Sequence, residues 1–481
     1  MSNVVVLGAG VCGLAAGLML ARDGHEVTVL ERDPEPVPES LDRAWERWDR
    51  RGVAQFRQAH FLQARGRHVL DAELPDVRDA LAAAGARRAN PLDELIPPSI
   101  SDRRPRPGDE RFETLTARRP VLEHVLARAA EAQPGLSVRR GVTVAGLDTR
   151  ERGGVRHVQG VRTTSNRTVS SDLVVDAMGR RSPSSGWLRD RGTAPVPEEA
   201  GDGGFLYYTR YFRSHDGSLP EARASWHCAL GSFSILTLPA DTGMWSITIC
   251  ISSRDRLLKR LRFPDRWKAL VRACPRHAHW LEGEPVGGIL PMGGLVDRRR
   301  RFVAGGRPVA TGIAAVADAW ACTNPSLGRG MALGLAHAAR LRDVLREHPS
   351  DAAAFAPAWD RTTEEEFTPW YRATVAVDRA RLAEIEALRT GAPVPAPAGP
   401  VAALSAAFPT AMVRDADLFR AGLEISSCLT PPQEVFSRPG LAARVMELGG
   451  RNGDRRARRP SREELVELMS PARGVCTALV G

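Results

Sequence analysis

The first part of the chain switches between a strand-like and a helix-like spacing of apolar residues. Residues 3–7, Asn-Val-Val-Val-Leu, form an apolar run of the kind that fills a buried strand. Residues 27–30 form a second run, which ends at Glu31. Between them, apolar residues recur at helical spacing until Asp23-Gly24 ends the pattern: Leu14, Ala15, Leu18, Met19, Leu20 and Ala21. The pattern predicts a strand, a helix and a second strand.

Two later apolar runs each lead into a turn. Residues 172–176, Asp-Leu-Val-Val-Asp, precede a Gly/Ser turn at 179–182. Residues 309–317 precede Asp318, and a loop with Pro325 follows. The next residues predict a helix with an apolar face made of Leu335, Ala338, Leu341 and Leu345. Both runs are predicted to be core strands.

The region between these two runs has β character. Residues 204–213 are one candidate strand. Residues 233–238 and 244–251 predict a hairpin around the Pro- and Gly-containing turn at 239–243. Residues 256–273 predict an amphipathic helix.

The end of the chain is helical in pattern. Residues 363–388 predict a long helix, and residues 391–400 predict a Pro/Ala/Gly-rich linker or turn. Ser461 to Glu464 form a capping box that opens a last helix. We interpret this tail as a helical buttress rather than a partner-binding module.

The composition is that of a globular protein with more than one packed unit. The chain has 481 residues, of which 43% are hydrophobic and 26% charged. It contains no apolar run of about eighteen residues, the length that predicts a membrane span. Its first apolar run already belongs to a strand rather than to a secretory leader. We therefore expect a cytoplasmic protein without a membrane-spanning segment.

The formal net charge of +10 comes from residues that are mostly scattered arginines. The tightest clusters are residues 298–301 and residues 455–459. No aromatic-rich platform for single strands and no zinc-ligand spacing accompanies them, so we expect neither a nucleic-acid partner nor a metal site. The cysteines form no Cys-x-x-Cys pair and are expected to be reduced packing residues: Cys12, Cys228, Cys250, Cys274, Cys322, Cys428 and Cys476.

The turn after the first strand carries a nucleotide-binding fingerprint, Gly8-Ala-Gly10-Val-Cys-Gly13. Gly8 permits the tight turn, Gly10 lets the backbone approach a pyrophosphate, and Gly13 lets the helix pack closely on the strand. The positive end of that helix faces the phosphate charge. Glu31, followed by Arg32, lies eighteen residues after Gly13, where a carboxylate accepts hydrogen bonds from a ribose. These features predict a dinucleotide site.

The segment from Asp318 to Met331 favours FAD over NAD as the dinucleotide. Asp318 is suited to hold the hydroxyls of a ribityl chain, and Pro325 fixes the loop that follows. Gly328 and Gly330 permit close approach of the backbone. The helix that begins there directs its positive end at the flavin pyrimidine ring.

The order of these segments resembles the class A flavoprotein monooxygenase superfamily, which has the p-hydroxybenzoate hydroxylase fold. Arg119-Pro-Val-Leu-Glu123 looks like that group's Arg-Pro-x-Leu-Glu helix start, whose arginine reaches the cofactor. Residues 51–62 are similar to a bacterial branch near the polyether and squalene epoxidases and the geranylgeranyl reductases. The resemblance covers approximately residues 1–390.

This resemblance implies an α/β (α+β) fold with three parts. We expect a discontinuous Rossmann-like FAD-binding domain at residues 1–200 and 285–350, an interleaved sheet that covers the substrate at 201–284, and C-terminal helices at 351–481.

Two motifs depart from the pattern of the superfamily. Ala317-Asp318-Ala319 replaces the usual Gly-Asp-Ala, which we expect to shift the loop while keeping the ribityl contact. Asp176-Ala-Met-Gly179 replaces the usual Asp-Gly, and this leaves open how the chain handles a pyridine nucleotide.

The implied activity is that of an FAD-dependent monooxygenase. NADPH or NADH would reduce the flavin, and a flavin hydroperoxide formed with O₂ would epoxidise or hydroxylate an apolar alkene or aromatic intermediate of specialised metabolism. The Trp-x-Trp-x-Ile-Pro segment of flavin halogenases is absent, the nearest stretch being residues 244–249. A double-bond reductase of the geranylgeranyl-reductase type and a non-catalytic flavin- or lipid-binding module are alternatives. The oligomeric state stays open.

Candidates for the reaction site lie in the loop near residue 60 and in the middle sheet. Gln58 and His60 are candidate catalytic residues, because donors near the isoalloxazine would stabilise reduced flavin. Ordinary hydrogen bonding within the loop explains these two residues equally well. Aromatic residues of a sheet commonly belong to the core, but four residues are candidates for contact with the substrate: Tyr207, Tyr208, Arg210 and Trp226.

Overall fold

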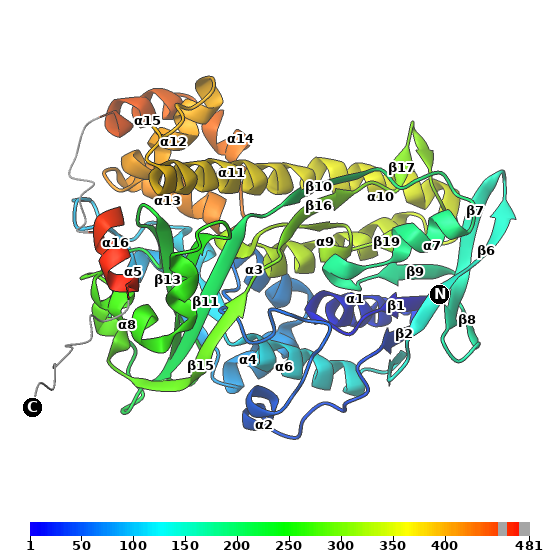
Figure 1. Ribbon diagram of the computed structural model, residues 1–481. Helices are drawn as coiled ribbons and strands as arrows, with labels where there is room; N and C mark the ends of the chain where they lie inside the picture. The colour runs from blue at the N-terminus through cyan, green and yellow to red at the C-terminus, as the bar shows by residue number, and fades with distance from the viewer. Residues whose placement is uncertain (451–458, 471–481) are drawn as a thin grey trace, which may run out of the picture.

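The computed structural model describes residues 1–450 and 459–470, which are built around two five-stranded sheets (Figure 1). The arginines at 455, 456 and 458 and the cysteine at 476 lie outside these residues. The predicted mixed α/β fold, with a parallel sheet, a second sheet and C-terminal helices, is confirmed. Among the described helices, none has the length and apolarity that crossing a membrane requires.

The first sheet is parallel throughout. Its strands, in spatial order, are β19 (Ile313–Ala315), β9 (Leu173–Asp176), β1 (Asn3–Leu7), β2 (Glu26–Glu31) and β5 (Leu136–Arg140). One face is covered by α1 (Val11–Arg22), α6 (Arg119–Ala132) and α9 (Gly330–Glu347). The other carries an antiparallel layer of β6 (Val144–Arg152), β7 (Val155–Thr163) and β8 (Thr168–Ser170).

The apolar run of the first strand is explained by burial on both of its faces. Val4 and Val6 pack among the helices, whereas Val5 and Leu7 pack toward the β6–β8 layer. All four side chains are at most 1% exposed. A strand between two covering layers therefore needs continuous apolar sequence rather than alternation.

The second sheet is antiparallel and will be called the covering sheet. Its strands, in spatial order, are β12 (His227–Ala229), β13 (Phe233–Pro239), β14 (Met244–Ser252), β11 (Phe205–Arg213) and β15 (Glu284–Met292). The pairing of β13 with β14 confirms the predicted hairpin. Because β15 pairs with β11, the expected domain boundary after residue 284 falls inside this sheet, not at its edge.

The outer face of the covering sheet packs on short helices. These are η3 (Leu258–Arg262), α8 (Pro264–Arg272) and, from the end of the chain, α16 (Arg462–Met469). The prediction of one helix over 256–273 is wrong, because Phe263 is extended, with φ −90° and ψ 125°, and α8 begins at Pro264. Proline suits the first helical turn but not a helix interior. The predicted capping box of Ser461 and Glu464 is confirmed.

A three-stranded ribbon joins the two sheets. It contains β10 (Glu198–Asp202), β16 (Val296–Arg300) and β20 (Ala321–Cys322). The remaining elements are shorter or peripheral: α2 (Leu41–Glu46), α3 (Ala64–Glu73), α4 (Pro75–Ala83), α5 (Pro91–Glu94), α7 (Ser184–Asp190), β3 (Arg87–Ala89), β4 (Thr114–Thr116), β17 (Val303–Ala304) and β18 (Arg307–Pro308).

The helices after residue 350 are spread over the molecule rather than gathered in one region. The predicted helix over 363–388 is interrupted at Phe367, which separates α10 (Ala352–Glu366) from α11 (Thr368–Thr390). In Figure 1, α11 extends from the parallel-sheet side toward the covering sheet. A cluster of helices follows the predicted Pro/Ala/Gly turn: α12 (Pro400–Met412), α13 (Ala416–Ser426), α14 (Pro432–Phe436) and α15 (Leu441–Gly449).

A buried ion pair fixes the covering sheet to the parallel-sheet side. Arg118, directly before α6, donates from Nη2 to Asp241 Oδ2 at 2.6 Å and from Nε to the same oxygen at 2.9 Å. Its backbone N–H also donates to Asp241 Oδ1 at 2.7 Å. Asp241 lies in the turn between β13 and β14 and is 1% exposed.

Replacing Asp241 is expected to destabilise the fold strongly. Asp241→Asn leaves the buried Arg118 without a counter-charge, a change that costs about 3 kcal/mol in comparable buried pairs. Denaturant unfolding of the variant and of the unmodified protein measures the loss. Asp49→Asn, which removes half of the exposed pair with Arg51, is the control and should change little. Equal losses in the two variants would contradict this assignment.

Candidate functional site

A large cavity of about 3900 Å³ lies between the parallel sheet and the covering sheet. Pockets for drug-sized ligands are commonly about 300–1000 Å³, so this cavity has room for a dinucleotide and a second molecule. All the residues predicted to hold the cofactor line it, although they come from distant parts of the sequence: Gly8, Gly10, Gly13, Glu31, Arg32, Arg119, Asp318, Pro325, Gly328, Gly330 and Met331.

The glycine turn leaves the start of α1 open to this cavity. Gly8 has a φ of +101°, and a Cβ on Gly13 would lie 2.0 Å from the carbonyl oxygen of Gly8. A Cβ on Gly10 would meet no atom within 4 Å, because Gly10 faces open space. No side chain caps the helix here, so its first N–H groups are free to bind an anion.

Glu31 is held by protein groups at the end of β2. Its Oε2 accepts from the N–H of Ala9 at 2.8 Å and from Nη2 of Arg50 at 2.9 Å. Its Oε1 accepts from the N–H of Asp33 at 3.0 Å. Since a carboxylate offers about four acceptor positions, room for one further donor, such as a ribose hydroxyl, is left.

Arg50 also lines the cavity, on the side formed by the parallel sheet, and the sequence analysis did not identify it. Its guanidinium lies 3.3 Å from Asp33 Oδ2 and 3.5 Å from Glu123 Oε2, in addition to its bond with Glu31. Its side chain is only 2% exposed. No spacing rule marks an arginine between Asp49 and Arg51, and only the tertiary structure brings three carboxylates around it.

Arg119 and His60 meet at the centre of the cavity wall. Arg119 donates from Nε to Glu123 Oε1 at 2.6 Å, and its Nη1 lies 3.5 Å from Nε2 of His60. His60 Nδ1 is 2.8 Å from the carbonyl oxygen of Gln58, so Nδ1 carries the proton and Nε2 is the acceptor. Burial, and then the charge of Arg119, lower the pKa of His60 to about 3. His60 is therefore a neutral acceptor that orients Arg119.

The amide of Gln58 is committed to the covering sheet. Its Nε2 donates to the carbonyl oxygen of Leu290 at 3.2 Å, and its Oε1 accepts from Thr209 Oγ1 at 2.7 Å. Its own carbonyl oxygen accepts from the hydroxyl of Tyr211 at 2.8 Å. These are ordinary structural hydrogen bonds, which the sequence analysis gave as the alternative to a catalytic role for Gln58.

Only two of the four candidate substrate residues line the cavity, namely Tyr207 and Trp226. Tyr208 points to the outer face, where its hydroxyl donates to the carbonyl oxygen of Lys259 at 3.3 Å. The guanidinium of Arg210 lies 6.0 Å from the Phe212 ring, away from the cavity lining.

The reason is that successive strand residues point to opposite faces. Thr209, two residues after Tyr207, lines the cavity and was missed by the sequence analysis. The hydroxyl of Tyr207 donates to Asn324 Oδ1 at 2.7 Å, which joins the covering sheet to the loop that precedes α9.

The turn at Asp318 keeps the shape that glycine usually supplies. Ala317 has a φ of 51°, and its N–H donates to Nδ1 of His337 at 3.1 Å. Burial raises the pKa of Asp318, and Arg119 partly offsets this effect. A Cβ on Gly330 would lie 4.0 Å from Asp318 Oδ1, so this carboxyl group is next to the start of α9. The substitution of glycine by alanine therefore keeps Asp318 at the cavity and strains the backbone.

The wall thus offers the groups that FAD requires. An uncapped helix start suits the pyrophosphate, Glu31 and Asp318 suit the two sugar-like portions, and Arg119 supplies a cation between them. In the described part of the chain, no three His, Cys, Asp or Glu side chains cluster as a metal site would require. The six described cysteines are unpaired.

Comparison with known proteins is consistent with an FAD site in this cavity. The profile of a family described as FAD binding domain matches residues 1–190. A protein of Mycobacterium tuberculosis, Rv3254, is 28% identical over 374 residues, which is 72% of this chain and 74% of that protein. The kynurenine 3-monooxygenase of Salinispora tropica is 28% identical over 387 residues, covering 74% of this chain and 75% of the enzyme.

Solved structures share the fold. PqsL, a probable FAD-dependent monooxygenase from Pseudomonas aeruginosa, gives a TM-score of 0.56 at 18% identity and covers 80% of this chain and 99% of its own. The flavin-dependent brominase Bmp2 gives a TM-score of 0.61 at 14% identity, with coverages of 94% and 100%.

Relieving the strain at Ala317 should stabilise the protein. A left-handed backbone costs alanine about 1 kcal/mol more than glycine, so Ala317→Gly is expected to raise the free energy of unfolding by about that amount. Denaturant unfolding measures the change. Ala315→Gly, in the adjacent strand β19, is the control and should lower stability instead. A loss of stability in Ala317→Gly would refute the assignment of strain.

Stability should fall in acid through His337. Burial lowers its pKa to about 3 from an ordinary value of 6.5, and its Nδ1 must stay unprotonated to accept from Ala317. The stabilisation is present above pH 6.5 and is lost as the pH falls toward 3, because only the unfolded chain binds the proton there.

The matched variant is His337→Asn, whose side-chain oxygen can replace Nδ1 and does not titrate. Between pH 7 and pH 5, the unmodified protein should lose about 2 kcal/mol more stability than this variant. Denaturant unfolding at both pH values gives the two slopes. Parallel slopes would show that His337 makes no such contribution.

Proposed function

The chain belongs to the class A flavoprotein monooxygenase superfamily, and on that premise we propose that it uses FAD, with NADPH or NADH and O₂, to epoxidise or hydroxylate an apolar alkene or aromatic substrate. One observation carries the proposal: the glycine turn, Arg119 and the segment from Asp318 to Met331 line one cavity, and the covering sheet lies across it. The cavity also exceeds what a dinucleotide alone requires.

The cofactor would lie along the parallel-sheet wall. The open start of α1 at Gly10 would bind the pyrophosphate, and the remaining acceptor position of Glu31 would bind the adenosine ribose. Asp318 would hold the ribityl hydroxyls, with the start of α9 beside the flavin ring. Bound FAD would accept a hydride from the nicotinamide and activate O₂ for the transfer of one oxygen atom.

The chain's own part in the reaction is to bind, orient and exclude water. His60, neutral and fixed by the carbonyl of Gln58, would orient Arg119 toward the cofactor. Tyr207 and Thr209 would form the opposite wall, on which the substrate rests. Where a bound cofactor and substrate displace water from this cavity, charges inside it would interact more strongly than they would in solvent.

Oxygen dependence is the decisive test. FAD-loaded protein is incubated with NADPH or NADH and with aromatic and polyene compounds, under ¹⁸O₂ and without oxygen. We expect a compound that stimulates nicotinamide oxidation and acquires one ¹⁸O atom under ¹⁸O₂, with no product in the absence of O₂, as mass spectrometry would show. A reduced product formed without O₂ would instead indicate a double-bond reductase.

Asp318→Asn provides the variant for this test, and Asp172→Asn provides its control. Asp318→Asn should lower FAD affinity at least about tenfold, because a charge-assisted bond to the ribityl chain is lost. The carboxylate of Asp172 accepts from the N–H of Asn3 outside the cavity, so its variant should retain FAD. A flavin that neither nicotinamide reduces, with any compound, would favour a non-catalytic binding module.

A further inference from the structure

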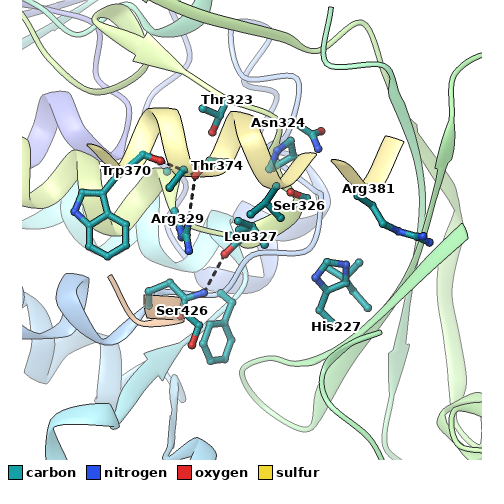
Figure 2. A pocket seen from close by; sticks show the side chains of 18 of the residues that line it. His227, Thr323, Asn324, Ser326, Leu327, Arg329, Trp370, Thr374, Arg381 and Ser426 are labelled. Carbon is teal, nitrogen blue, oxygen red and sulfur yellow. Dashed lines mark hydrogen bonds between the residues drawn. The ribbon is translucent and has the colours of Figure 1, made fainter. Parts of the chain in front are cut away.

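Arg329, between two glycines of the cofactor loop, turns its side chain toward the C-terminal helices (Figure 2). Its Nη1 donates to Thr374 Oγ1 of α11 at 3.0 Å, and its Nη2 donates to the carbonyl oxygen of Ile425 in α13 at 3.3 Å. Its guanidinium lies 5.3 Å from the centre of the Trp370 ring. The side chain lines the cavity and is 6% exposed.

This arginine lacks a counter-charge. Among the described residues, every other buried arginine has a carboxylate within ion-pair distance: Arg50, Arg118, Arg119, Arg299, Arg300, Arg342 and Arg420. Arg329 has neutral partners only, and its Nε has no hydrogen-bond partner at all.

The carboxyl group of Asp378, on the same helix as Thr374, does not fill this role. Its Oδ1 accepts from Ser326 Oγ at 2.5 Å, and it is not among the hydrogen-bond partners of Arg329, which are Thr374 and Ile425. Burial raises the pKa of Asp378 to about 7, so this group is only partly charged at neutral pH.

A buried cation without an anion is costly, by several kcal/mol before any compensation. Burial accordingly lowers the pKa of Arg329, and the more distant Cys428 and Asp378 offset this effect only in part. Its immediate surroundings in the cavity combine hydroxyls, at Ser326 and Ser426, with apolar surface at Leu327 and Trp370. Such a lining suits a carboxylate attached to an apolar body.

We propose that Arg329 binds the carboxylate of the substrate, so that the substrate is an anionic molecule with an apolar alkene or aromatic portion. Nη1 and Nη2 each use one hydrogen on a neutral partner and keep a second hydrogen for a carboxylate oxygen, and the ring of Trp370 provides an apolar surface beside the guanidinium. The guanidinium is held against α11 and α13, outside the parallel sheet with its dinucleotide motif. This inference rests on the proposed function, and it narrows the substrate class.

Matched acids and amides test the charge without turnover. Calorimetry measures the affinity of FAD-loaded protein for benzoate and benzamide, 2-naphthoate and 2-naphthamide, and octanoate and octanamide. At least one acid should bind about tenfold more tightly than its amide, the effect of one charge-assisted hydrogen bond. Arg329→Met should reduce that ratio to about one. Arg329→Gln, which also removes the charge, is the second variant.

Arg381→Met is the matched control, because Arg381 lines the same cavity but is paired with Glu384 at 2.7 Å. It should keep the preference for acids. The proposal is overturned if no acid is preferred, if both Arg329 variants keep the preference, or if Arg329→Met lowers only the flavin midpoint potential. The last result would make Arg329 the counter-charge of reduced flavin. Because no nicotinamide or O₂ is used, these outcomes are independent of the oxygen-transfer test.

Discussion

The ion cluster around Arg50 is the interaction on which the cofactor wall depends. Arg50 joins Glu31 at the end of β2 to Glu123 in α6, and its Nη2 also donates to the carbonyl oxygen of Ala9 in the glycine turn. Glu123 in turn accepts from Arg119. One buried cation thus sets the relative positions of a strand end, a turn and a helix start that are remote in the sequence.

The cluster holds the cofactor wall together through side chains of the protein itself. Its carboxylates outnumber its arginines, so the cations inside it are fully neutralised, and each of them is oriented by at least one hydrogen bond. Two consecutive arginines, one before α6 and one at its start, have different partners. Arg118 binds the covering sheet through Asp241, whereas Arg119 faces the cavity.

The local parts of this structure could be predicted from the sequence. The glycine turn depends on short-range sterics, and the motif spacing brought Arg119 and Asp318 to one cavity as expected. Arg50 and Arg329 could not be identified, because the sequence surrounding each of them does not indicate that the folded chain brings three carboxylates to Arg50 and only neutral partners to Arg329. The pairing of β15 with β11 is also a long-range contact, so the sequence did not show that the residues directly after 284 belong to the covering sheet.

The orientation of residues on β11 was equally beyond the sequence. This strand is buried on both faces, so aromatic residues occur in both phases and their identity does not show which face they occupy. The interruptions of the predicted helices 256–273 and 363–388 were missed for a different reason. The apolar pattern continues through Phe263 and Phe367, but Pro264 and Pro369, each in a first helical turn, are sequence signals for the helix starts that the pattern alone does not show.

The alternation of side chains along β11 also separates the residues that shape the cavity from the residues that stabilise the fold. Tyr207 and Thr209 line the cavity, whereas Tyr208 and Phe212 belong to the core beneath the outer helices. A substitution at the first pair therefore changes the surface of the cavity, whereas a substitution at the second pair changes the packing of the core and hence the stability of the fold.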